Sequence, residues 1–369
     1  DTTDHAMPVD SSFDRPADAA IDLDLPTTDI SLDSDLPAPD TSISQDAPSA
    51  DLLAAADIPV AGCVTLGEAP TQPLGGISQS VAAAGSLVII GASDTVTDGV
   101  TLYTRSGSSL TQEGTFSTSI GLGALNGTDN EVVGTYLRND RAYLATYYGG
   151  VVVLDVSNPA SPSFVAGLHI INETWAVQAT DTHIFATNTG LGLVVLQVQG
   201  ENLVQLTTLP LAGAPHDLHI VGDQLFVATY SHVHEVDIST PDAPQLVRSV
   251  DTFTHAYELW SGDGRYIYVV EKMNARLVVL DMSATPGDEQ VAVFDTGTAA
   301  RCVDGAGNHL VVGTDDRLLS YDLSIPEAPA PLDGPTTNQS TYEVALIDGV
   351  VIAGLRDGTV QMGEVQACP

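Results

Sequence analysis

The stretch VVVLDVSNPASP, at residues 151–162, decides the fold, because related stretches recur along the chain at a regular interval. Each is an aliphatic run that ends in Asp-aliphatic-Ser and is followed by a proline turn. Clear copies are HEVDISTPDAP at 234–244, LVVLDMSATP at 277–286 and LLSYDLSIPEAP at 318–329, and degenerate copies are LVVLQVQGE at 193–201 and VQMGEVQACP at 360–369. The aligned residues that end the aliphatic runs are Asp155, Gln197, Asp237, Asp281, Asp322 and Glu364.

The spacing of these copies indicates a β-propeller. The aligned residues are 42, 40, 44, 41 and 42 positions apart, and a repeat of roughly 40–45 residues is typical of a four-stranded propeller blade. The repeat that contains HEVDISTPDAP reads as four short runs bounded by Gly, Asp and Pro. These runs are HDLHIV (216–221), QLFVAT (224–229), HVHEVDIS (232–239) and QLVRSV (245–250). Such runs are expected to be strands. With an earlier copy at 99–116, the chain is predicted to be an all-β, seven-bladed propeller of four-stranded blades.

The ring is expected to close with a strand from the N-terminal side. The predicted blades span 78–122, 131–168, 174–212, 215–252, 256–297, 299–332 and 341–368. The seventh holds only three strands, and GCVTLGEAP at 62–70 resembles the missing outer strand. Aligning these segments with the third blade puts Cys63 beside Cys368, so we predict a disulfide between them. In the chain-entropy model, a loop of about 300 residues closed in this way is worth more than ~4 kcal/mol.

The remaining cysteine, Cys302, lies in a predicted inner strand, in the segment AARCVDG. A lone cysteine in such a place is usually a small buried hydrophobe. A nucleophilic thiol would need a nearby histidine and a lowered pKa. We therefore expect a structural role for Cys302.

The first 60 residues differ from the rest of the chain. They contain fourteen Asp, no Glu, no Lys and one Arg, with Pro, Ser, Thr and Ala filling most of the remainder. Low hydrophobicity and uniform charge cannot offset the entropy of ordering, so residues 1–60 are predicted to be a disordered acidic tether and residues 61–369 to be the propeller. The sequence begins at Asp1 rather than at methionine, and we expect that a secretory leader has been removed.

Charge excludes several classes of partner. The net charge is −37, with 48 acidic and 11 basic residues, and Lys272 is the single lysine. Such a field repels nucleic acids and anionic lipid headgroups. No window approaches the ~20 apolar residues of a membrane-spanning helix. We therefore expect neither nucleic-acid binding nor a transmembrane segment.

The third strands read VVVLD, LVVLQ, VHEVD, LVVLD and LLSYD, followed by a turn of the DVSNPASP type, and they resemble those of the LVIVD-repeat family of bacterial and archaeal surface proteins. The resemblance covers about residues 78–369. It implies an extracytoplasmic propeller, secreted or held at the cell surface like a bacterial lipoprotein, with lipid or wall attachment through the tether. It implies no common enzymatic activity.

Propellers bind ligands where their inner strands begin, at the mouth of the central channel. Alignment of the repeats puts a chemically mixed set of residues at this mouth, namely Trp175, His216, His255, Tyr257, Arg301 and Tyr342. Aromatic and charged groups that converge on a concavity form the default ligand site. The alternative is that the rings pack between blades and the histidines cap strands. No motif assigns a catalytic residue, a metal ligand or a cofactor site, so we expect no cofactor.

Three functions fit these observations. The first is a binding or scaffold module for a surface protein or a glycan, without catalysis. The second is an enzyme that uses the channel mouth, either a lactonase-like hydrolase or a quinoprotein-like oxidoreductase, which fold analogy alone supports. The third is a structural component of an envelope assembly.

Overall fold

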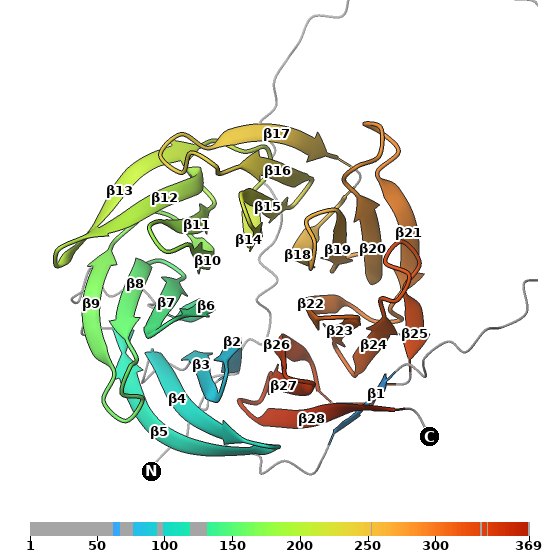
Figure 1. The fold of residues 1–369 in the computed structure, drawn as a ribbon, viewed down its shortest axis with the longest axis horizontal. Helices are drawn as coiled ribbons and strands as arrows, with labels where there is room; N and C mark the ends of the chain where they lie inside the picture. The colour runs from blue at the N-terminus through green and yellow to red at the C-terminus, as the bar shows by residue number, and fades with distance from the viewer. Residues whose placement is uncertain are drawn as a thin grey trace, which may run out of the picture. The chain divides into compact units, whose positions relative to one another are not determined.

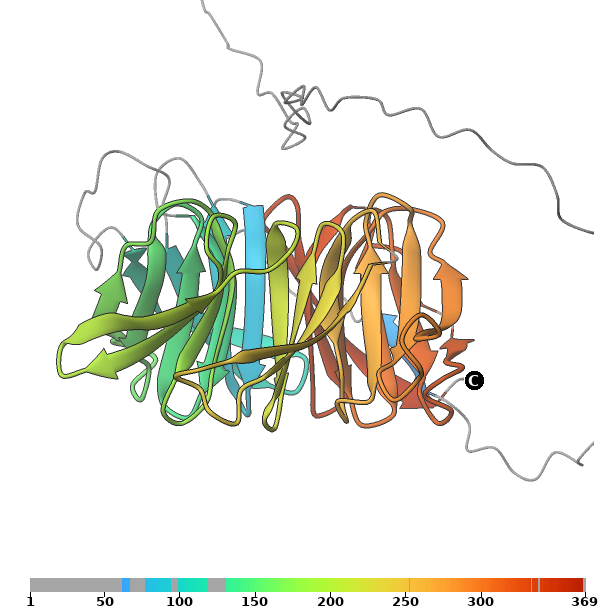
Figure 2. The same cartoon turned by 90° about the horizontal axis from the view of Figure 1, so that it is seen from above.

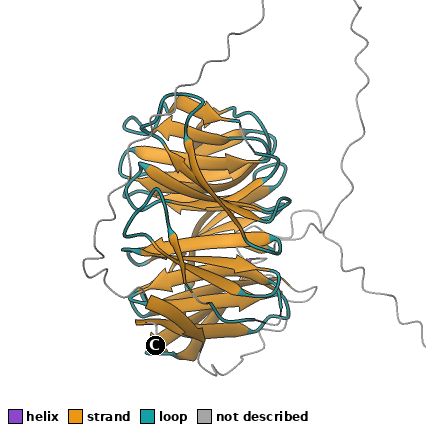
Figure 3. Ribbon diagram, turned by 90° about the vertical axis from the view of Figure 1, so that its right-hand side faces the viewer, coloured by secondary structure: helices purple, strands orange, loops and turns teal. Residues whose placement is uncertain are grey.

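The structure, a computed structural model, describes residues 62–66, 77–93, 99–118, 131–251, 253–332, 334–337 and 339–367. In this part of the chain, seven four-stranded antiparallel sheets form the blades of a ring (Figure 1). Loops join the strands within and between the blades (Figure 3). The predicted seven-bladed propeller is confirmed. The predicted tether at 1–60 lies outside the described residues.

The blades follow one another along the chain, and each starts with its inner strand. Blade 1 contains β2 (Ile77–Ala84), β3 (Leu87–Ser93), β4 (Gly99–Ser106) and β5 (Ser109–Ser117). Blade 2 contains β6 (Val132–Arg138), β7 (Arg141–Thr146), β8 (Gly150–Asp155) and β9 (Ser163–Leu168). Blade 3 contains β10 (Thr174–Ala179), β11 (Ile184–Asn188), β12 (Gly192–Gln199) and β13 (Asn202–Leu209). Blade 4 contains β14 (Pro215–Val221), β15 (Gln224–Thr229), β16 (Val233–Asp237) and β17 (Gln245–Val250).

The remaining blades have the same order. Blade 5 contains β18 (Ala256–Trp260), β19 (Tyr266–Glu271), β20 (Arg276–Asp281) and β21 (Gln290–Asp295). Blade 6 contains β22 (Ala300–Ala306), β23 (His309–Thr314), β24 (Leu318–Asp322) and β25 (Ala330–Leu332). Blade 7 contains β26 (Thr341–Ile347), β27 (Val350–Leu355), β28 (Val360–Ala367) and, from the other end of the chain, β1 (Gly62–Leu66).

The ring closes as the sequence predicts. Strand β1 pairs antiparallel with β28, so the N-terminal strand becomes the outer strand of blade 7. Gly62 lies opposite Ala367, and Cys63 lies opposite Gln366. Cys368 and the side chain of Cys63 lie outside the described residues, so their disulfide stays a prediction. Counting free thiols in the denatured, unreduced protein checks it: the bond leaves one, and a count of three would contradict it.

The Asp-aliphatic-Ser signature has a local structural role. Oδ1 of Asp155 accepts hydrogen bonds from the backbone N (3.0 Å) and the Oγ (2.6 Å) of Ser157. The Asp281–Ser283 and Asp322–Ser324 pairs repeat both bonds. These bonds stabilise the turn between the third and outer strands, because an aspartate side chain can replace a backbone partner two residues on.

The core lies between neighbouring blades. The middle strands are aliphatic on both faces, and each buried cluster combines residues of two adjacent blades, such as Phe226 of blade 4 with Ile267 of blade 5. Burial of both faces explains why these runs are continuously apolar instead of alternating. The strands run along the depth of the ring (Figure 2). Because every blade repeats the same antiparallel order from its inner strand outward, all seven inner strands begin at one face of the ring. The loops between the second and third strands lie at the same face. No described helix is long and apolar enough to cross a bilayer.

Candidate functional site at the channel mouth

A β-bulge occurs at the same place in every inner strand. Near the start of each strand, the register with the second strand shifts. The residues left unpaired by these shifts are, from blade 1 to blade 7, Gln79, Val133, Trp175 with Ala176, His216, Tyr257, Arg301 and Tyr342. A bulge changes the direction of a side chain and is common beside functional sites.

Five of the six residues that the sequence assigns to the mouth are these bulge residues: Trp175, His216, Tyr257, Arg301 and Tyr342. His255 instead lies directly before β18. The inner strands surround a central cavity of about 290 Å³, to which all seven contribute lining residues. Four of the predicted residues line it, while Arg301 and His255 lie outside its lining.

Aromatic and imidazole rings form one contiguous cluster over blades 2 to 5, which we call the mouth cluster. Its members are Tyr147, Tyr148, Trp175, His216, Tyr230, His255 and Tyr257. The ring of Trp175 lies 4.9 Å from that of Tyr147 and 4.4 Å from that of His216. The His216 ring lies 4.6 Å from Tyr257, and His255 stacks on Tyr230 at 4.1 Å. Tyr230 is 45% exposed, so the cluster reaches the surface of the ring.

The two histidines of the cluster are buried among its rings. Burial, and then the positive charge of Lys272, lower the pKa of His255 to about 4. Burial lowers the pKa of His216 well below its usual value, and the neighbouring His255 and Lys272 act in the same direction. Both rings are therefore neutral at pH 7. Nε2 of His255 and Nε1 of Trp175 are buried without a hydrogen-bond partner in the described structure.

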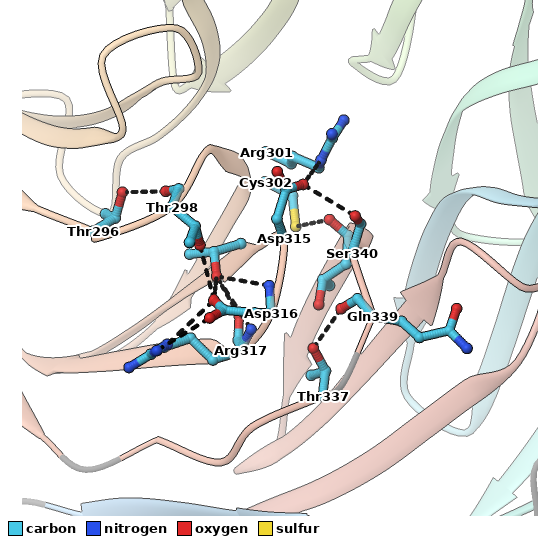
Figure 4. Close-up of polar contacts among 12 residues, drawn as sticks. Thr296, Thr298, Arg301, Cys302, Asp315, Asp316, Arg317, Thr337, Gln339 and Ser340 are labelled. Atoms are coloured by element: carbon cyan, nitrogen blue, oxygen red, sulfur yellow. Dashed lines mark hydrogen bonds and ion pairs between the residues drawn. The ribbon is translucent and has the colours of Figure 1, made fainter. Parts of the chain in front are cut away.

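Two cations lie beside the cluster, each over the face of a tyrosine. Nζ of Lys272 lies 4.7 Å from the ring centroid of Tyr257, and Cζ of Arg301 lies 5.1 Å from that of Tyr342. Nε of Arg301 donates a 2.5 Å hydrogen bond to Oδ1 of Asp315, which also accepts one from Ser340 at 3.0 Å (Figure 4). The mouth thus combines aromatic faces with two basic side chains on blades 5 and 6, of which Arg301 is paired with Asp315.

A carboxylate lies on the opposite side of the cluster. Oε1 of Glu173 accepts hydrogen bonds from the hydroxyls of Tyr147 (2.8 Å) and Tyr148 (3.4 Å). Both bonds end on the same oxygen, and Oε2 takes part in neither. Glu173 directly precedes β10, so it has the position in blade 3 that His255 has in blade 5.

Deeper in the channel, polar side chains connect the inner strands of successive blades. Oδ2 of Asp217 accepts from the backbone N of Leu259 at 3.0 Å, and Oδ2 of Asp304 accepts from that of Leu346 at 2.7 Å. Glu258 accepts in the same way from Val303 at 3.2 Å. Blade 3 uses a neutral group, because Oε1 of Gln178 accepts from the N of Ile220 at 2.9 Å.

The channel carboxyls hold their protons unusually tightly. Burial raises the pKa of Asp304 and of Asp217 to about 7, and for Asp217 repulsion from Asp304 adds to burial. Burial also raises the pKa of Glu343 to about 8, although a hydrogen bond with Glu258 opposes this shift. The pKa of Glu258 is well above its usual range, first from burial and then from the charge of Glu343. A carboxyl that is protonated at neutral pH can donate a hydrogen bond as well as accept one.

Cys302 is buried on β22, as the sequence suggests. Its thiol lies 3.9 Å from the carbonyl oxygen of Thr341, and burial raises its pKa well above the usual value. Raised pKa values suppress the thiolate that a nucleophile needs. Among the described residues, no three or more His, Cys, Asp and Glu side chains are grouped so that they could hold a metal ion.

Sequence reasoning missed two sets of residues at the mouth. The first comprises Tyr147, Tyr230 and Lys272, which follow the second strands of blades 2, 4 and 5. Their common position in the repeat was a readable signal, since each comes directly after an aliphatic second strand. The second set is the group of channel carboxyls, of which Glu258 and Glu343 directly follow bulge residues. A bulge leaves no clear trace in the sequence, so their inward direction was not predictable.

Comparisons with known proteins agree with this architecture. The LVIVD repeat family model matches residues 133–168 and 212–252, which correspond to blades 2 and 4. No curated protein matches the chain. The WD40 β-propeller domain of Doa1 is 11% identical with a TM-score of 0.63. The similarity covers 82% of this chain and 97% of the Doa1 domain.

Two further solved structures are similar. The computationally designed Ika8 protein is 14% identical with a TM-score of 0.58 and covers 82% of this chain and 100% of its own. Sqt1 of Saccharomyces cerevisiae is 10% identical with a TM-score of 0.58, over 83% of this chain and 98% of its own. Identities this low show the fold alone. Because 1414 chains of known structure are similar, the fold does not select a function, which must be argued from the site.

Proposed function

We propose that this LVIVD-repeat β-propeller is a binding module, without catalytic activity, whose ligand face is the channel mouth. The observation that carries the proposal is the mouth cluster, which joins side chains of four blades into one aromatic surface beside a cavity of about 290 Å³. Tyrosine and tryptophan supply large contact areas at a small cost in side-chain entropy, and they are enriched at binding sites.

The surroundings of the cluster support a binding surface. Two exposed apolar side chains lie in loops on the same face, Ile171 at 74% and Met273 at 71% exposure. Ile171 precedes β10 and Met273 follows β19, so both belong to blades that contribute to the mouth cluster. Exposed apolar groups on the face that carries an aromatic cluster are compatible with an interaction site there.

The chemistry of the mouth favours binding over turnover. A nucleophile needs a base within hydrogen-bonding reach. His216 and His255 instead pack against aromatic rings, and Cys302 has a raised pKa. A lactonase-like or quinoprotein-like enzyme remains the second candidate, and it predicts turnover that depends on the same residues. The module is proposed to work outside the cytoplasm, at the cell surface, where its partner is a glycan or a surface protein.

Binding screens of the full chain test the proposal. Immobilised glycans and purified envelope proteins are probed with the parent protein and with Trp175→Ala, which removes a central ring of the mouth cluster. We expect at least a tenfold loss of affinity for the ligand that the parent selects. Phe164→Ala, which removes an exposed ring on an outer strand, is the matched control. Equal binding by the parent and by Trp175→Ala would contradict a ligand face at the mouth.

A further inference from the structure

We propose that the channel mouth recognises the carboxylate of an acidic sugar, of the uronic-acid class, with Lys272 and Arg301 as the recognition pair. This inference rests on the proposed function, because it names the ligand class of the same site. The structural basis is that two basic side chains on adjacent blades, each over the face of a tyrosine ring, lie beside the mouth cluster.

The placement of positive charge is the first argument. Only 11 of 369 residues are basic against 48 acidic ones, and Lys272 is the single lysine. Solubility does not require a cation in so acidic a protein. The lysine nevertheless lies at the channel mouth, directly after β19, and Arg301 occupies the bulge of the next inner strand. Both cations therefore lie where the fold presents ligands.

The geometry of the two cations is the second argument. They lie over two bulge tyrosines, since Nζ of Lys272 is 4.7 Å from the ring centroid of Tyr257 and Cζ of Arg301 is 5.1 Å from that of Tyr342. The charge of Arg301 also lowers the pKa of Tyr257, against the larger raising effect of burial. Asp315 accepts from Nε of Arg301, and the terminal guanidinium nitrogens point away from Asp315 in Figure 4. These terminal nitrogens form the fork that pairs with carboxylates in two parallel hydrogen bonds.

The rings beside the cations favour a sugar as the carrier of the carboxylate. A pyranose ring has a C–H face that packs on an aromatic ring, and hydroxyls that need donors and acceptors around it. The mouth cluster supplies aromatic surface, while Oε2 of Glu173 can accept from a ligand hydroxyl. Glu173 and Lys272 lie on blades 3 and 5, so they bracket the rings of Trp175, His216 and Tyr257.

The overall charge limits the ligand to one or a few carboxylates. A net charge of −37 repels a long polyanion. At physiological ionic strength, screening acts over about 8 Å, so nearby cations dominate the field on a single small anion. The channel carboxyls add a further dependence. Asp217, Asp304 and Glu343 gain charge as the pH rises through 7 to 8, so an anion at the mouth should bind more weakly there.

The test compares three probes that differ in charge and framework. The probes are a trisaccharide that ends in glucuronic acid, the same trisaccharide ending in glucose, and a short peptide with a free C-terminal carboxylate. Calorimetric titration of the full chain at pH 6 should give at least tenfold tighter binding of the acidic trisaccharide than of either other probe. Its affinity should fall at least threefold between pH 6 and pH 8.5.

Variants at the two cations identify the recognition pair. In Lys272→Gln and Arg301→Gln, the preference for the acidic over the neutral trisaccharide should fall below threefold, and Arg301→Lys should keep part of it. Arg138→Gln, which removes the arginine at the end of β6 from an exposed ion pair with Asp181 in the β10–β11 turn, should leave the preference unchanged. Melting temperatures within a few degrees of the parent show that each variant folds.

The outcomes separate this inference from the proposed function. An unchanged preference in both glutamine variants would overturn the recognition pair while leaving the binding module intact. Tighter binding of the peptide than of either trisaccharide would overturn the sugar class and point to a protein terminus as ligand. If Trp175→Ala loses no affinity for whichever probe binds, both the inference and the proposed site are wrong.

Discussion

The inner strands of blades 1 and 2 have the same bulged backbone as those of blades 4 and 5, but they line the central cavity with no charged side chain and with one aromatic ring, Tyr136. Each inner strand has its bulge in the same place, yet blades 1 and 2 carry Gln79 and Val133 where blades 4 and 5 carry His216 and Tyr257. At the following position, Ser80 and Gly134 correspond to Asp217 and Glu258. The arc of blades 1 and 2 lines the cavity with neutral side chains, and the arc of blades 4 to 7 adds carboxyls to it.

The two arcs also connect neighbouring blades in different ways. Between blades 2 and 3 the backbones touch, since a Cβ at Gly134 would lie 2.5 Å from the carbonyl oxygen of Trp175. In the arc of blades 4 to 7, a carboxyl of one blade accepts a hydrogen bond from a backbone N–H of the next. Asp217 of blade 4 bonds to blade 5 in this way, and Asp304 of blade 6 bonds to blade 7. One backbone repeat therefore tolerates two kinds of inter-blade contact, and only the second brings titratable groups into the channel.

Gly134→Val should have the largest effect on stability. Its side chain would clash with the backbone of blade 3, and overpacking of this kind costs about 3 kcal/mol. Chemical denaturation measures the change in the free energy of unfolding. Gly85→Ala is the control, because Gly85 has a φ of +57° and no atom within 4 Å of a Cβ, so only backbone strain of about 1 kcal/mol is expected there. Equal losses in the two variants would contradict close backbone contact between blades 2 and 3.

Asp304→Asn should change the pH dependence of stability. Burial raises the pKa of Asp304 to about 7 in the folded protein, so the folded state binds this proton more tightly than the unfolded state does. Its contribution to stability is full below pH 4 and is lost as the pH rises from about 4 to about 7. Asparagine keeps an acceptor for the N–H of Leu346 and does not titrate.

The measurement for Asp304 is a difference between two pH profiles. The free energy of unfolding of the parent, relative to Asp304→Asn, should fall by about 2 kcal/mol or more between pH 4.5 and pH 7.5, because a tenfold difference in proton affinity between the folded and unfolded states corresponds to about 1.4 kcal/mol. Subtraction removes the opposite contribution of the buried histidines, such as His219, whose pKa burial lowers to about 4. A flat difference would mean that Asp304 is well solvated in the channel.

Gln178→Leu tests the neutral counterpart of these contacts. The substitution leaves the backbone N–H of Ile220 without its 2.9 Å acceptor, which should cost about 1 kcal/mol. The loss should be the same at pH 4.5 and pH 7.5, because Gln178 does not titrate. A loss that varies with pH would show that the connection between blades 3 and 4 depends on the carboxyls of the charged arc.

Val133→Ala should have the smallest effect of all, on ligand binding. Val133 holds the bulge position of blade 2 but adds no ring or charge to the mouth cluster. Affinity for the ligand chosen in the binding screen should change less than twofold, against at least tenfold for Trp175→Ala. Comparable losses would mean that the ligand spans the whole channel instead of the aromatic and charged arc.

Much of the fold could be predicted because the repeat leaves a strong trace in the sequence. The Asp-aliphatic-Ser signature marks the third strand of most blades, and the missing strand of blade 7 pointed to β1. The site was partly predictable. Repeat alignment identified five of the bulge residues, namely Trp175, His216, Tyr257, Arg301 and Tyr342, but it also assigned His255, which precedes β18, to the same set of positions. It did not reach Tyr147, Tyr230, Lys272 or the channel carboxyls as a group.

The sequence by itself determined the blade count, the order of the strands and the origin of the closing strand. Periodicity and turn chemistry are local properties, so they can be read without coordinates. Only the tertiary structure decided which side chains meet in the channel, because that depends on a bulge in each inner strand and on contacts between residues about 42 positions apart, such as Asp217 with Leu259. The raised pKa values of the carboxyls follow from the same assembly, since the closed ring gathers them in a channel where their charge is less well solvated than in open water.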